Sequence, residues 1–100
     1  MGDWGPHLAW LEVRDVDGPG MAHGATLGRA RLLRLLPAIF SDLGPFVSVV
    51  NHHGATVLRL VSYDAAEYRE LEALARMRLL GAGYQSQVVE RNARAGRARG

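Results

Sequence analysis

Breaks rich in glycine and proline divide this chain into short segments whose apolar patterns alternate between those of strands and those of helices. Segments rich in branched and aromatic residues predict strands at residues 7–16, 46–51, 56–63 and 84–90. Between them, apolar residues recur at helical spacing, at positions 32, 35, 36, 39 and 43 and at positions 68, 71, 74, 75 and 79. The sequence therefore predicts the order strand, helix, strand, strand, helix, strand.

Short signals mark the ends of these elements. Residues 15–24 hold three Gly and one Pro and predict a loop, after which the first helix begins near Thr26. Pro37 predicts a kink in that helix, because it lacks an N–H and disfavours a helical residue before it. Asp64 begins a capping box and predicts the start of the second helix.

This order predicts an α+β fold, a ferredoxin-like β-α-β-β-α-β sandwich in which a four-stranded antiparallel sheet carries two helices on one face. The chain has 100 residues, of which 48% are hydrophobic and 22% charged, so it is long enough for one packed core. We expect a single domain over residues 7–91 and a flexible Arg-rich tail over residues 92–100.

The charge of the chain is unevenly distributed. Residues 1–90 contain eight Arg and all ten acidic residues, whereas residues 91–100 contain four Arg and no acid. The net charge of +2 therefore comes from the tail. All twelve basic residues are Arg, which favours recognition of phosphate or carboxylate but is also typical of a GC-rich genome.

Several classes of protein are excluded by what the sequence lacks. The chain has no cysteine, which excludes disulfides, thiolate metal sites and cysteine nucleophiles. No apolar run is long enough for a membrane span, and the first residues lack the pattern of a signal peptide. We therefore expect a cytoplasmic protein with no membrane partner.

The predicted topology brings several unusual side chains to one end of the sheet. The loop after the first strand, the turn at residues 52–54 and the turn before the last strand share that end. The residues collected there are Asp15, Asp17, His23, Arg29, His52, His53, Arg78 and Tyr84. We expect a ligand site at this end.

A small anionic ligand or a partner protein is the occupant that this end favours. A glycine-containing loop that leads into a helix start leaves backbone N–H groups free, and these favour anions. Arginines would add charge and histidines would add hydrogen bonds. The glycine spacing does not match the dinucleotide or phosphate-loop fingerprints. The predicted ligand-binding residues are Gly20, Gly24, Arg29, His52, His53 and Arg78.

The candidate residues for two further interpretations are His23, His52 and His53. Histidines with nearby aspartates are suitable metal ligands. However, adjacent residues of an extended hairpin point to opposite faces, and no H-x-x-x-H or H-x-H pair is present, so we predict neither a metal site nor a cofactor. Alternatively, one histidine is the general base of a small cofactor-free enzyme, because histidine titrates near neutrality. No motif decides whether the chain is an enzyme.

The sheet face opposite the helices carries more apolar surface than a small monomer leaves in water. A second copy of the chain is the simplest cover, because two-fold homodimers are the commonest oligomers. We therefore predict a homo-oligomer, most simply a dimer, that associates through this face. The predicted interface residues are Trp10, Val57, Val61 and Tyr63.

Nucleic acid is an alternative partner for the same face. RNA-recognition modules share this strand order and stack bases on aromatic residues of the first and third strands. Trp10 fits that pattern, but the third strand has Val57, Arg59 and Val61 where rings are expected. The tail would bind phosphates through Arg91, Arg94, Arg97 and Arg99. A structural subunit of a larger assembly is a further alternative, because assembly needs apolar surface and no motif.

Overall fold

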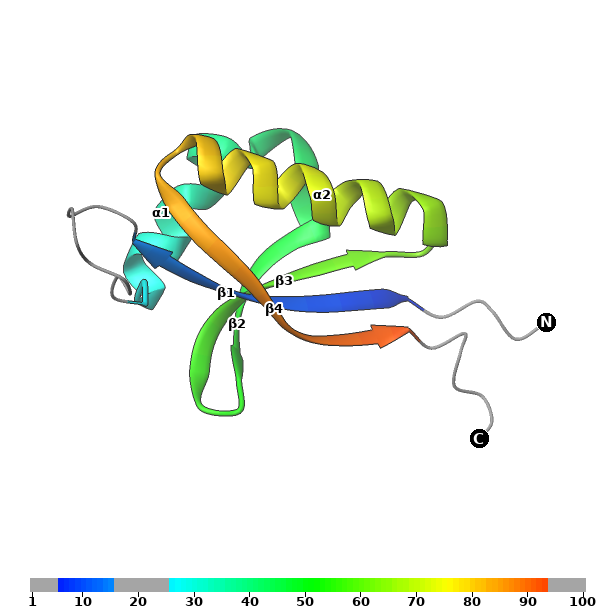
Figure 1. Ribbon diagram of the computed structural model, residues 1–100, viewed down its shortest axis with the longest axis horizontal. Coiled ribbons are helices and arrows are strands. Elements are labelled where there is room, and N and C mark those ends of the chain that lie inside the picture. The colour runs from blue at the N-terminus through cyan, green and yellow to red at the C-terminus, as the bar shows by residue number, and fades with distance from the viewer. Residues whose placement is uncertain (1–5, 16–25, 94–100) are drawn as a thin grey trace.

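The computed structural model describes residues 6–15 and 26–93. In chain order the elements are β1 (His7–Asp15), α1 (Arg29–Ile39), the short 3-10 helix η1 (Ser41–Phe46), β2 (Val47–His52), β3 (Ala55–Ser62), α2 (Ala65–Gly81) and β4 (Tyr84–Ala93) (Figure 1). The predicted class is confirmed, because the fold is α+β with a four-stranded antiparallel sheet and two α-helices. Among the helices described, none is long and apolar enough to cross a membrane.

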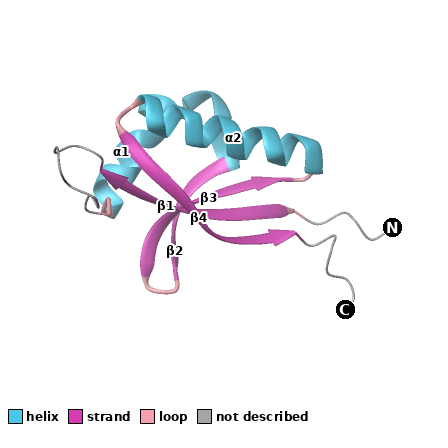
Figure 2. Ribbon diagram, in the orientation of Figure 1, coloured by secondary structure: helices cyan, strands magenta, loops and turns pink. Residues whose placement is uncertain are grey.

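The strands lie in the order β2-β3-β1-β4, and α1 and α2 cover one face of the sheet (Figure 2). Alternate residues of β1, namely Ala9, Leu11 and Val13, have no exposed surface. They pack in one core cluster with Leu58 and Leu60 of β3 and with buried residues of both helices. The intervening side chains lie on the opposite face, because successive side chains of a strand alternate. We call it the outer face; it comprises Leu8, Trp10, Glu12, Ser48, Val50, Val57, Arg59, Val61 and Glu90.

The first helix begins later than the sequence predicts. Thr26 forms an isolated bridge with Arg14, and the Leu27 amide donates to the Val13 carbonyl at 2.9 Å. This segment is therefore an extended strip beside β1, and α1 starts only at Arg29. The helix contains Pro37 two residues before its end at Ile39, although proline has no N–H to donate to the Leu33 carbonyl.

The second helix follows the prediction closely. Asp64 caps it, since its carboxylate accepts from the Ala66 amide at 3.2 Å. Tyr68, Leu71, Ala75 and Leu79 are buried, at helical spacing, toward the sheet. After α2, the chain turns into β4 through a glycine with positive φ, at position 83.

The two neighbours of β1 pair with different lengths of it. Pairing between β1 and β3 ends at Leu11 and Leu58, whereas pairing between β1 and β4 continues to Asp15 and Tyr84. The start of β3 and the end of β2 are therefore not attached to β1. Their hairpin extends away from the helical layer (Figure 1). The hairpin tip lies over the outer face, where His52 and His53 contact Glu90 of β4.

Candidate functional site

The tip of the β2–β3 hairpin is a two-residue turn with an unusual backbone. His53 has a φ of 54° and Gly54 a φ of 83°, as in a type I′ turn. The Gly54 amide donates to the Asn51 side-chain oxygen at 3.2 Å. Histidine adopts positive φ more readily than most residues, although Asn and Gly are the usual choices in such turns.

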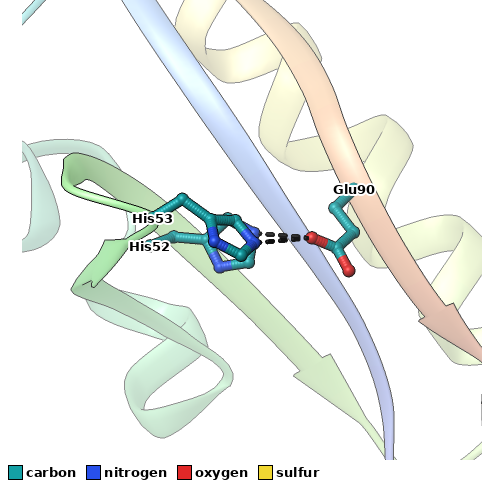
Figure 3. A group of neighbouring side chains, drawn as sticks. All are labelled: His52, His53 and Glu90. Atoms are coloured by element: carbon teal, nitrogen blue, oxygen red, sulfur yellow. Dashed lines mark hydrogen bonds and ion pairs between the residues drawn. The ribbon is translucent and has the colours of Figure 1, made fainter.

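Four side chains meet beneath this turn, and we call them the hairpin cluster: Trp10, His52, His53 and Glu90. The Nε2 atoms of His52 and His53 lie 2.7 and 3.5 Å from Oε1 of Glu90 (Figure 3). The His52 ring is stacked on the Trp10 indole, with centroids 4.5 Å apart and planes 13° apart. It also meets the His53 ring edge-on, at 4.2 Å. Both imidazoles thus converge on one carboxylate oxygen.

The three polar members differ in their exposure. The His52 side chain is 16% exposed, the Glu90 side chain 47% and the His53 side chain 80%. His52 is therefore held between an indole and a carboxylate, whereas His53 and Glu90 leave the cluster open to solvent. Of the three polar groups, His53 is therefore the most accessible to solvent and His52 the least.

Glu90 is the member that the sequence did not reveal. It lies on β4 opposite Trp10, two strands away from the hairpin, and a bulge between the Trp10 and Leu11 pairs leaves Val89 without a partner. This extra residue sets which β4 side chains face outward. The length of the strand is visible in the sequence, but the bulge that aims Glu90 is not.

The structure divides the predicted ligand-binding group. His52 and His53 lie together at the hairpin tip, with both rings directed at Glu90. Asp15 pairs instead with Arg31 at 3.3 Å and lies opposite Tyr84 in the β1–β4 ladder. Asp17, Gly20, His23 and Gly24 lie outside the described residues. Arg29 is exposed at the first position of α1.

Arg78 is engaged within the chain. Its guanidinium donates to both carboxylate oxygens of Asp42, at 2.6 and 2.9 Å, and to the Ile39 carbonyl at 2.7 Å. These hydrogen bonds lower the pKa of Asp42 below its usual value and raise the pKa of Arg78. The sequence predicted Arg78 as a ligand contact. In the structure its hydrogen bonds to Asp42 and Ile39 join α2 to the end of α1.

The predicted interface residues differ in how much surface they offer. Tyr63 is 71% exposed, and Val61 is partly exposed. Val57 is only 2% exposed within the single chain, and Trp10 is partly covered by His52. Of these four residues, Tyr63 therefore offers the most accessible surface in the single chain.

Of the four tail arginines, only Arg91 lies within the described residues, and β4 continues past it to Ala93. Arg91 donates to both carboxylate oxygens of Glu72 on α2, at 3.1 and 2.6 Å. This pairing lowers the pKa of Glu72. Arg91 is thus neutralised by an acid beside it, which argues against a free phosphate contact there. Arg94, Arg97 and Arg99 lie outside the described residues.

Comparison of the chain with protein-family models, with curated proteins and with solved structures found no match.

Proposed function

We propose that this chain is a small homo-oligomeric binding module, most simply a dimer, that self-associates through the outer face and takes its ligand at the hairpin cluster. The observation that carries the proposal is the one-sided cover of the sheet. Both helices pack on one face, while the other carries the hairpin cluster and a row of half-buried apolar side chains. A small solute or a partner protein is the class of ligand that so open a cluster fits.

Self-association is supported by what remains uncovered. Leu8 and Val61 face each other across β1 and β3 and are both partly exposed, and Tyr63 follows at the end of β3. Apolar area without cover favours an added layer. A second copy related by a two-fold axis is the simplest one.

The test is the solution mass of the full chain by light scattering behind a sizing column. We expect about twice the 10.9 kDa of one chain. Val61→Glu would give a monomer, because it places a charge in the apolar part of the outer face. The matched control is Leu33→Glu, which changes an equally apolar residue, 43% exposed on α1, and would leave the dimer intact. A monomeric wild type at every concentration, or a dimer that Leu33→Glu breaks and Val61→Glu does not, would overturn the proposal.

The finer class of the fold is proposed with it. The chain order of strands and helices, with both helices on one face, supports a ferredoxin-like sandwich. That class hosts unrelated functions, so the assignment adds nothing to the choice of ligand.

A further inference from the structure

We infer that His52, His53 and Glu90 form a binding site for a divalent transition-metal ion such as Zn²⁺. The inference rests on the proposal that the hairpin cluster is the ligand site, and it names the class of ligand. It does not depend on self-association.

The donor atoms of His52, His53 and Glu90 are of the kinds that bind transition-metal ions. Two imidazole nitrogens and one carboxylate oxygen are the ligands that Zn²⁺ and its neighbours in the first transition row prefer. The group includes an acid, so it favours a cation over the anion that the sequence predicted for this end of the fold.

The three ligand atoms lie close enough together to bind one metal ion. The three ligand atoms all lie within 4.8 Å of one another, and the two His–Glu separations are 2.7 and 3.5 Å. Tetrahedral Zn²⁺ with bonds of about 2.1 Å separates neighbouring ligand atoms by about 3.4 Å. The observed spacings bracket that value. Small side-chain rotations therefore suffice for one ion to replace the His52–Glu90 hydrogen bond and the His53–Glu90 contact, and a fourth position stays open to water.

The backbone conformation of His53 explains how two adjacent histidines reach the same carboxylate. Neighbouring residues of an extended strand point to opposite faces, which was the reason to predict no metal site at two adjacent histidines. His53 escapes that rule because its φ of 54° is left-handed, so its ring turns to the same carboxylate as that of His52 (Figure 3). A turn residue of this kind is more often Asn or Gly. Histidine at this position thus costs some turn stability and gains a second imidazole ligand.

Packing against Trp10 restricts the orientation of the His52 ring. Its ring is stacked on Trp10 and is only 16% exposed, so its orientation is set before an ion arrives. A ligand held in place by its surroundings loses less conformational entropy on binding. The same contact puts an indole next to the ion, which gives the experiment an optical signal.

The experiment is a titration of the full chain with Zn²⁺ in a calorimeter. It is repeated with Cu²⁺ by tryptophan fluorescence in a Trp4→Phe background, where Trp10 is the remaining indole. We expect one ion per chain, and quenching of Trp10 that saturates at the same ratio. His52→Ala, His53→Asn and Glu90→Gln would each weaken binding by at least about 10- to 100-fold, since even outer partners of metal ligands contribute that much. Glu70→Gln, an exposed acid on α2, is the matched control and would bind as wild type.

His53→Asn keeps the test independent of folding, because Asn suits the turn better than His does. Wild type without Zn²⁺ binding, or ligand variants that bind as wild type does, would overturn the metal inference. His23→Ala shows whether the loop histidine predicted from the sequence belongs to the site; if its loss alone abolishes binding, the three-residue site is wrong. Light scattering on the same samples separates the two proposals, because a dimer without metal binding removes only the metal site, and a metal-binding monomer removes only self-association.

Discussion

Arg78 on α2 and Asp42 in η1, 36 positions apart in the chain, are joined by two parallel hydrogen bonds of 2.6 and 2.9 Å. The same guanidinium donates to the Ile39 carbonyl, which belongs to the last turn of α1. A carbonyl at a helix end has no partner within its own helix. Arg78 therefore satisfies an acceptor, neutralises an acid and ties the two helices together at one point.

This relationship predicts that Arg78→Ala lowers the free energy of unfolding, measured by urea denaturation at neutral pH. Arg78→Lys would recover only part of the loss, because an ammonium group cannot match both carboxylate oxygens and the carbonyl at once. Arg69→Ala is the control, since Arg69 is exposed on the same helix. Equal stabilities of the Arg78→Ala and Arg69→Ala variants would show that the contact stabilises nothing.

The same pair predicts a dependence on pH. Arg78 holds the pKa of Asp42 below its ordinary value of 3.8, so the carboxylate form is favoured by folding. The stabilisation is complete above that ordinary value and is lost as the pH falls through the lowered value of the folded state. Asp42→Asn would therefore be less stable than wild type near pH 7, and the difference would shrink under strong acid. A difference that stays constant between neutral and strongly acid pH would contradict this origin.

The order of elements was predictable because each depends on local signals. Alternating apolar residues identified the strands, and Asp64 identified the start of α2, which the structure confirms. The later start of α1 was not predictable, because Thr26 and Leu27 lie where β1 accepts an extended partner. That choice depends on a pairing between distant segments, which local propensity does not encode.

The candidate site was predictable only in part, for a related reason. The two adjacent histidines were visible in the sequence as residues of the turn. Their convergence depends on one left-handed residue, His53, and on the bulge that aims Glu90 outward. The sequence placed Arg78 among the ligand-binding candidates, but it could not show the partner, Asp42, which lies 36 positions away in the chain. Contacts across the fold decide which charged groups remain available to a ligand.

Tyr68 predicts an effect at the other end of the pH scale. Burial, followed by the nearby charge of Glu72, raises the pKa of Tyr68 to about 12. Burial disfavours the ionised phenol in the folded state, so the stability of the fold is unaffected by this ionisation below the ordinary value of 10 and falls as the pH rises toward 12. An ultraviolet titration of the three tyrosines would show one late ionisation, accompanied by unfolding, and Tyr68→Phe would remove that step. A late step that persists in Tyr68→Phe would assign it elsewhere.

The Tyr68 hydroxyl also predicts the effect of its removal at neutral pH. It is buried, and no hydrogen bond of normal geometry reaches it from the described residues, although Glu72 and Arg91 lie close enough to affect its pKa; the ring packs 5.7 Å from His7. A buried polar atom without a partner is destabilising. Tyr68→Phe keeps the ring and would be neutral or more stable by up to about 1 kcal/mol. Tyr68→Leu, which loses the ring contact, is the comparison, and a clear loss of stability in Tyr68→Phe would show that the hydroxyl has a partner.

The backbone of the His53–Gly54 turn predicts how substitutions of His53 change the stability of the chain. His53 occupies a left-handed position that Asn adopts at less cost, and Gly54 already fits the second position of the same turn. His53→Asn would therefore stabilise the chain by about 0.5 to 1 kcal/mol, measured by thermal or urea unfolding with a chelator present. His53→Ala would be less stable than His53→Asn, because a methyl side chain gains nothing in this backbone conformation. If added Zn²⁺ raises the stability of wild type above that of His53→Asn, the two measurements together separate the cost of this histidine from its use. If His53→Asn is no more stable than wild type in chelator, the turn does not strain His53. Histidine at this position would then cost the turn no stability.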